Sequence, residues 1–460
     1  MHHPIRIRLM YHTPLKSKLK FLQVTAKSLW TYVVLGLLVF YALLYLVLDL
    51  PTNLEDFASV NPLRTLLGAL ATGLITAQAL VFTISLVAAQ LNARYTHRMV
   101  SRIFTWPTGI FMGLFIGSSI YSMVVLATLS SQPTSFLIVL PGGLPALHPV
   151  TLALALAGTC LVLLVPYLWS FKQRLDPERM AVDEGRRAIA HLHKNPDREP
   201  SGIAALDNIV MSAYGYRDYD TFARSMDQLS RVGLEAWRLG RAALGESIFR
   251  RLAQIGVSTV DDPRAPFQVI DCLDSVGTIL AGDGVQEAAR QAAVAVSGVG
   301  EVAVEKAQVA VVRRVAAVLS ALGERAAERD LLATAEESAY SLGYLGGLAS
   351  RRGLEDSTRQ IAAFLRRVGS RAAEANMDLV TRQATVSLWS LGGSAHRHLH
   401  HCSEIVAKEL ELMERVADQD LVDASYLAAP RSEELERFRR HYLKEIRRLS
   451  DEAVMELMGR

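Results

Sequence analysis

Residues 65–91 read TLLGALATGLITAQALVFTISLVAAQL, an apolar run without a single acidic, basic or histidine side chain. About twenty helical residues rise about 30 Å, the thickness of the hydrocarbon core of a bilayer. Three more uncharged stretches of this kind lie at about 29–48, 107–129 and 149–171. We therefore predict a four-helix transmembrane bundle within residues 29–172. Buried helices of a soluble core are the alternative, which would require protein on every side of all four.

The basic residues beside these stretches indicate the orientation of the bundle. Residues 1–172 carry eleven Lys and Arg against three Asp and Glu, whereas residues 173–460 are mildly acidic. Nearly all of the flanking basic residues lie before the first span, between the second and third, or after the fourth. Trp30, Trp106 and Trp169 lie at the same ends. Lysine and arginine mark cytoplasmic segments. We predict a multi-pass protein of the cell membrane with both termini in the cytoplasm.

Residues 1–28 form a basic amphipathic segment ahead of the first span. Apolar side chains at every third or fourth position of 15–26, with lysines around them, favour a helix lying along the membrane surface. The apolar run that follows is too long for a cleaved signal peptide, so we interpret it as a retained anchor. The lipid bilayer, and anionic lipid at its cytoplasmic face, are the expected partners.

Polar side chains recur every seven residues along the second predicted span. They are Thr76, Thr83 and Gln90 in one set and Gln78, Ser85 and Asn92 in the other. Amides are costly against lipid, so this helix should be surrounded by protein or border water. Hydrogen bonding between helices, a pore or cavity in a homo-oligomer, and a ligand site all fit this pattern. Serine and threonine can also bond their own helix backbone.

Gly109, Gly113 and Gly117 line one face of the third predicted span. Small residues at this spacing let helix backbones approach closely in lipid, so we predict helix packing at these glycines. The spans contain no carboxylate, which argues against a proton-coupled transporter.

From residue 173 the pattern changes to amphipathic helices. We predict a juxtamembrane helix and hinge at 173–202, a helical repeat-like domain at 203–428 and an amphipathic helix at 431–460. The last helix either docks on its own domain or forms an intermolecular coiled coil. The whole chain is predicted to be all-α.

The repeat prediction depends on glycine spacing. Glycines at 233, 256, 277, 300, 323, 346, 369 and 392 are 23 residues apart, with one step of 21. We expect each to end a helix of about 18 residues in the left-handed conformation. Two such helices give a unit of about 46 residues, which is typical of stacked helix pairs in an α-solenoid. A non-repetitive helical bundle is the alternative.

The strongest candidate for chemistry is the run His396-Arg-His398-Leu-His400-His401-Cys402. On one helix, His396 and His400 would share a face, as metal ligands do. Surface histidines in water are the simpler interpretation, so we predict no metal site and keep this pair as the candidate. The aromatic and acidic segment 214–220 is interpreted as a packed corner between helices.

Motifs of nucleotide binding or catalysis are missing from the sequence. It contains no P-loop, GxGxxG, GxSxG or HExxH element. The repeat-like part has no basic stripe with interleaved aromatics, so nucleic acid is not an expected partner. We predict no catalytic residues, no cofactor and no enzymatic activity.

Two parts of the chain resemble an uncharacterised bacterial family of predicted membrane proteins of unknown function. VFTISLVAAQLNARYTHRMVSRIF (81–104) followed by GLFIGSSIYSMVVL (113–126) looks like its second and third spans. GVSTVDDPRAPFQVIDCLDSV (256–276) is similar to its cytoplasmic block, in which Asp262 and Pro263 match an Asp-Pro pair before a helix. An aspartate before such a proline is also a helix-capping pattern. The family implies no known activity.

These observations favour a membrane-anchored scaffold or sensor whose helical cytoplasmic domain binds a cytosolic protein. The alternative is an oligomeric channel, with span 65–91 lining the pathway and the cytoplasmic domain gating it.

Overall fold

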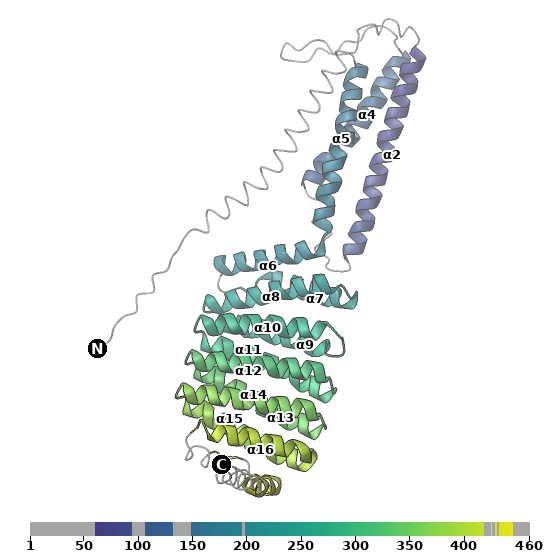
Figure 1. Cartoon of the computed structure of the whole chain (residues 1–460). Coiled ribbons are helices and arrows are strands. Elements are labelled where there is room, and N and C mark those ends of the chain that lie inside the picture. The colour runs from purple at the N-terminus through teal and green to yellow at the C-terminus, as the bar shows by residue number, and fades with distance from the viewer. Residues whose placement is uncertain are drawn as a thin grey trace, which may run out of the picture. The chain divides into compact units, whose positions relative to one another are not determined.

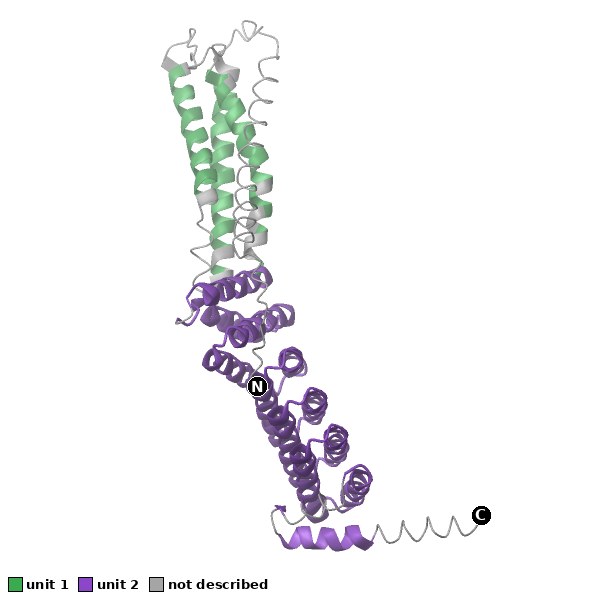
Figure 2. Ribbon diagram, turned by 90° about the vertical axis from the view of Figure 1, so that its left-hand side faces the viewer, with its two compact units in different colours: residues 1–176 green, residues 177–460 purple. Residues whose placement is uncertain are grey.

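The computed structural model describes residues 60–93, 106–131, 149–195, 198–417, 425, 428–429 and 432–444. Within these ranges the regular structure is entirely helical. The chain divides into two compact units, Met1–Asp176 and Pro177–Arg460, coloured separately in Figure 2. The predicted amino-terminal segment and first span, 1–48, lie outside the described residues.

The described part of the first unit consists of three long helices. They are α2 (Val60–Ala93), α4 (Trp106–Ser131) and α5 (Pro149–Leu175), labelled in Figure 1. Segments long and apolar enough to cross a membrane lie within them at Arg64–Val87, Gly109–Thr128 and Leu152–Trp169. Three of the four predicted spans are thus confirmed as helices of spanning length and composition.

Large apolar side chains on the outer surface of these helices fit a lipid environment. Leu80 on α2, Ile120 on α4 and Val165 on α5 are 60%, 57% and 71% exposed. Contiguous apolar surface of this kind is rare on soluble proteins. In hydrocarbon it costs nothing, because lipid tails are as apolar as the side chains.

The second unit is a stack of antiparallel helix pairs (Figure 1). Its helices are α6 (Pro177–Lys194), α7 (Ser201–Gly215), α8 (Tyr219–Arg238), α9 (Ala242–Ser258), α10 (Ala265–Gly282), α11 (Gln286–Glu305), α12 (Val309–Glu328), α13 (Leu332–Arg351), α14 (Glu355–Glu374), α15 (Asp378–His398) and α16 (His400–Glu414). From α8 to α16, each helix packs against its sequence neighbours and against the helix two places along. The stack therefore has two layers, one of even-numbered and one of odd-numbered helices. The solenoid-like repeat is confirmed.

The boundary of this unit differs from the predicted one. Residues 173–202 were expected to form a separate juxtamembrane helix and hinge, but α6 packs against α7 and α8 inside the stack. Gly185 of α6 lies so close to α8 that a Cβ built on it would be 2.6 Å from Gln228 Oε1. Residue 177 therefore begins the repeat domain.

The predicted period is right, but the predicted role of the glycines is wrong. All are buried within helices, and all except Gly256, which lies in the last turn of α9, are away from the helix ends; they are Gly233, Gly256, Gly277, Gly300, Gly323, Gly346, Gly369 and Gly392. They stand where helices cross. A Cβ built at Gly300 on α11, for example, would lie 2.6 Å from Val315 Cγ1 on α12 and 3.0 Å from Leu345 Cδ1 on α13. The missing side chain lets neighbouring helices approach.

Residues 433–444 form a further helix that docks on α15. Leu435, Phe438 and Tyr442 are buried. The Trp389 ring meets those of Phe438 and Tyr442 edge-on, with centroids 5.8 and 4.9 Å away. Of the two interpretations of the predicted helix 431–460, docking on its own domain is therefore the one observed for these residues. Residues 445–460 lie outside the described ranges.

Candidate functional site

Two threonines of the predicted polar stripes of α2 form hydrogen bonds within the helix itself. The hydroxyls of Thr76 and Thr83 donate to the carbonyls of Thr72 and Ala79, each at 2.8 Å. Ser85 is buried, Gln78 is half-buried and Gln90 is exposed. The side chain of Asn92 lies outside the described set. The stripes thus share no single environment, and the pore interpretation stays a prediction.

The glycine face predicted to pack α4 does not meet its described neighbours. Gly109, Gly113 and Gly117 are exposed, and nothing among the described residues lies within 4 Å of a Cβ built on any of them. Another face of α4 packs instead. Phe111 stacks on Tyr167 of α5 at 4.2 Å between centroids, and Phe115 is 1% exposed. Packing drives association in lipid, and aromatic rings provide more contact than glycines can.

Asp262 accepts backbone amides just before α10, but the N-cap of that helix is Arg264 and Pro263 does not begin it. Asp262 Oδ1 accepts the amides of Arg264 and Ala265 at 2.8 and 2.9 Å, and its Oδ2 accepts the Tyr219 hydroxyl at 2.7 Å. Burial alone would raise the pKa of Asp262, but these hydrogen bonds hold it below its usual value. Helix α10 starts two residues after Pro263, at Ala265.

The segment 214–220 is the packed corner that was predicted. Asp218 caps α8 by accepting the Thr221 amide at 3.1 Å, and the Tyr214 ring packs against Phe222 with centroids 6.1 Å apart. Together with the Tyr219 bond to Asp262, these contacts tie α7, α8 and α10 together. The corner is structural.

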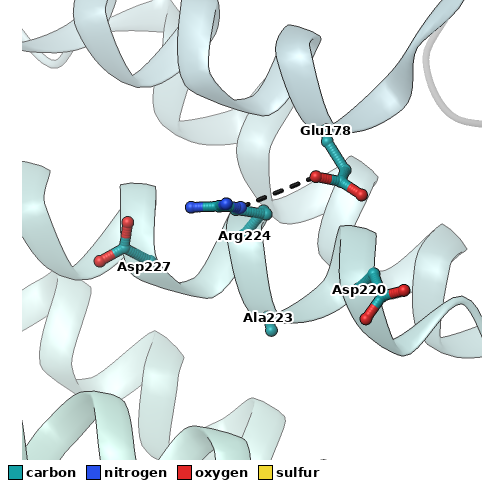
Figure 3. A pocket seen from close by; sticks show the side chains of 5 residues that line it. All are labelled: Glu178, Asp220, Ala223, Arg224 and Asp227. Carbon is teal, nitrogen blue, oxygen red and sulfur yellow. Dashed lines mark ion pairs between the residues drawn. The ribbon is translucent and has the colours of Figure 1, made fainter.

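A hollow of about 440 Å³ lies where α6 meets α8 (Figure 3). Glu178, Asp220, Ala223, Arg224 and Asp227 line it. Arg224 pairs with Glu178 at 3.7 Å, and Asp227 pairs with Arg231 at 3.1 Å. Because the hollow is open and its arginine pairs with a lining carboxylate, we assign it no ligand.

Ion pairs join successive helices of the even layer. The pairs are Arg314–Asp271 between α12 and α10, Arg313–Asp356 and Arg367–Glu324 between α12 and α14, and Arg366–Glu409 between α14 and α16, at 2.5–3.0 Å. Most of these side chains are partly exposed, so each pair adds only about 0–1 kcal/mol. Charges on this layer are thus engaged in holding the repeats in register.

The odd layer carries the candidate interaction surface. Val294 on α11 and Tyr340 on α13 are 46 residues apart, hold equivalent places in successive units, and are 39% and 56% exposed. Tyr344, one turn after Tyr340, is 41% exposed and donates a 3.0 Å hydrogen bond to Glu301. We call Val294, Glu301, Tyr340 and Tyr344 the tyrosine face.

Two contacts across the α11–α13 seam fix this face. Arg290 of α11 pairs with Glu337 of α13 at 3.4 Å, and the Tyr344–Glu301 bond closes the other end. Hydrogen bonding to Glu301, then burial, raises the pKa of Tyr344 and keeps its hydroxyl protonated. Rigid, exposed tyrosines are typical of protein-binding surfaces, because they give large contact area at low entropic cost. Sequence reasoning missed this face, since tyrosines four residues apart on a helix look like core positions.

The histidine run closes one helix and opens the next. Gly392 and Gly393 lie inside α15, which ends at His398, and α16 starts at His400. His396 and His400 therefore belong to different helices, yet their ring centroids lie 5.1 Å apart. The expectation of one shared helix is wrong, because Leu399 breaks it with φ −144° and ψ 71°.

A family of known sequences matches most of the first unit and the beginning of the second. Residues 26–210 match the family described as "Predicted membrane protein (DUF2254)". The match covers less than half of the 460 residues, and over this part the chain is similar to that family. The match includes the stretches 81–104 and 113–126 that suggested the resemblance, whereas the block 256–276 lies outside it.

No curated protein matches the chain. A solved structure described as a circular tandem repeat protein with novel repeat topology and enhanced subunit contact surfaces is similar at 14% identity and a TM-score of 0.36, over 86% of this chain and 98% of that one. At that TM-score the likeness supports no conclusion.

Proposed function

We propose that this protein is a membrane-anchored scaffold whose helical-repeat domain binds a cytosolic protein on the tyrosine face. The observation that carries the proposal is the exposure of Tyr340 and Tyr344 on the odd layer of the repeat stack. An exposed aromatic surface held by an ion pair and a tyrosine hydrogen bond suits a folded protein better than a small molecule.

The setting of this scaffold follows from the flanking charges. We place the first unit in the cell membrane, with both termini and the repeat domain in the cytoplasm, as the lysine and arginine distribution indicates. The protein then acts by holding a partner at the membrane rather than by catalysis. The channel alternative has less support, because Thr76 and Thr83 already bond within α2.

Site-specific photo-crosslinking tests the proposal. A photoreactive phenylalanine analogue replaces Tyr340 in the full-length protein in cells, and the control carries it at Arg325, an exposed position of the even layer. We expect a discrete adduct with one cytosolic protein from position 340 only, weakened by Tyr344→Ala. Equal crosslinking from both positions, or none from position 340, would contradict the proposal.

A further inference from the structure

Three histidines from three helices meet at the carboxyl-terminal end of the repeat domain. His396 lies in the last turn of α15, His400 opens α16, and His441 lies on the helix 433–444. The ring centroids of His396 and His441 are 5.8 Å apart, those of His400 and His441 are 6.0 Å apart, and those of His396 and His400 are 5.1 Å apart. The docking of the last helix thus adds a third imidazole to the pair in the sequence motif.

Two nitrogens of this cluster lack a partner. His396 Nδ1 and His441 Nε2 are shielded from solvent and accept or donate no hydrogen bond. A buried polar atom without a partner costs about 1–3 kcal/mol, so such an atom calls for an explanation. A ligand held by the rings would provide one.

Other contacts already place the rings. Phe438 and Tyr442, one on each side of His441, pack edge-on against Trp389 of α15. Leu435 lies against Gly393, where a built Cβ would be 3.2 Å from the Leu435 Cα. The histidines are therefore not needed to dock the helix, which leaves them for another role.

We propose that His396, His400 and His441 form a binding site for a divalent transition metal ion of the zinc class. Zinc–nitrogen bonds of about 2.0–2.1 Å place imidazole centroids about 3.2 Å from the metal, hence about 5.2 Å from one another in a tetrahedral site. One observed spacing, 5.1 Å, agrees with that value, and the other two, 5.8 and 6.0 Å, are longer. Among the described residues no three ligand atoms already converge on one point, so the rings must turn about their soft χ2 angles.

The surrounding charges are compatible with a cation. Arg437, one turn before His441, pairs with Glu433, and Arg397 pairs with Glu434 at 3.2 Å. Burial, then the electrostatic influence of His400, His441 and Arg437, lowers the pKa of His396. Bound metal would tie α15, α16 and the last helix together and leave a fourth position to water.

Titration with Co²⁺ tests the site, because tetrahedral Co²⁺ absorbs visible light and reports its own coordination. The full-length protein, purified without a polyhistidine tag and with His2 and His3 changed to alanine, is stripped with chelator and titrated. We expect saturation at one equivalent and displacement by Zn²⁺. His441→Ala and His400→Ala should each weaken binding at least about tenfold, since even outer-shell changes cost 10–100-fold.

His401→Ala is the matched control, because it removes an exposed histidine of the same run. It should bind Co²⁺ like the parent. His400 is itself exposed, so His400→Ala should leave the fold intact. His441→Ala is compared with it by tryptophan fluorescence, because undocking of the last helix would expose Trp389. The proposal is overturned if no saturable absorption appears, or if His400→Ala binds as tightly as His401→Ala.

Discussion

Turns of the repeat domain place one residue in the left-handed region of backbone space. Among the described residues these are Arg217, Gly240, Gly284, Ala307, Asp330, Gly353 and Asn376, with φ of 54–74°. Five of them, from 284 to 376, step by 23 residues, each seven residues after a buried glycine. The turn therefore needs the conformation but does not always use the residue that adopts it most cheaply.

Exchanging residues at this turn position should change stability in opposite directions. The Cβ of Ala307 is strained at φ 54°, and glycine has no Cβ. Ala307→Gly should therefore raise the free energy of unfolding by about 0.5 kcal/mol. Gly353→Ala at the equivalent turn should lower it by about 1–2 kcal/mol. Denaturant titration of the detergent-solubilised protein measures both. Changes of the same sign would show that backbone strain is not the controlling factor.

The stability of the carboxyl-terminal end of the repeat domain, where α15, α16 and the helix 433–444 meet, should depend on pH through His396. Because the pKa of His396 is lowered in the folded state, the unfolded chain binds the proton more tightly. The contribution of His396 to the free energy of unfolding is then fully present above its ordinary pKa of about 6.5. It decreases as the pH drops below that value. The denaturation midpoint of the chelator-treated protein, followed by Trp389 fluorescence, should decrease between pH 7 and pH 5. His396→Asn should flatten that slope, and an unchanged slope would contradict the assignment.

At the scale of elements, close helix crossings depend on buried glycines. Gly298 and Gly300 lie on the same helix, α11, but only Gly300 faces its neighbours. Gly300→Ala should destabilise the domain by about 1–3 kcal/mol through overpacking. Gly298→Ala, which meets nothing within 4 Å, should stabilise it by up to about 1 kcal/mol through helix propensity. Thermal melts of the two variants measure the difference. Equal effects would contradict a role of Gly300 in close helix packing.

The same glycines show how far sequence reasoning reaches. Their 23-residue spacing predicted the repeat length, because each unit must present its small residue to the next at the same place. Their position was misread, because glycine both ends helices and permits close crossings, and spacing alone cannot separate the two. The true turns carry Arg, Ala, Asp and Asn as well as Gly, so they leave no uniform signal.

The candidate sites were less accessible to sequence reasoning than the fold. His441 lies about forty residues beyond His400, and only the docking of Phe438 and Tyr442 on Trp389 brings it to the pair. The tyrosine face depends on which side of α13 is covered, and that is set by α11 and α15 rather than by the α13 sequence. By contrast, hydrophobic length predicted α2, α4 and α5, because spanning a bilayer is a constraint on each helix separately.

At the scale of the whole molecule, we expect the tyrosine face to lie in the cytoplasm and to be covered by a protein partner. One cysteine can report on both. Tyr340→Cys is placed in a protein whose Cys160, Cys272 and Cys402 are changed to serine, and a membrane-impermeant maleimide is applied to intact cells and to inside-out membrane vesicles. We predict no labelling in cells, rapid labelling of washed vesicles, and slower labelling when cytosol is restored. Labelling of intact cells would contradict the account, and so would a vesicle rate that cytosol leaves unchanged.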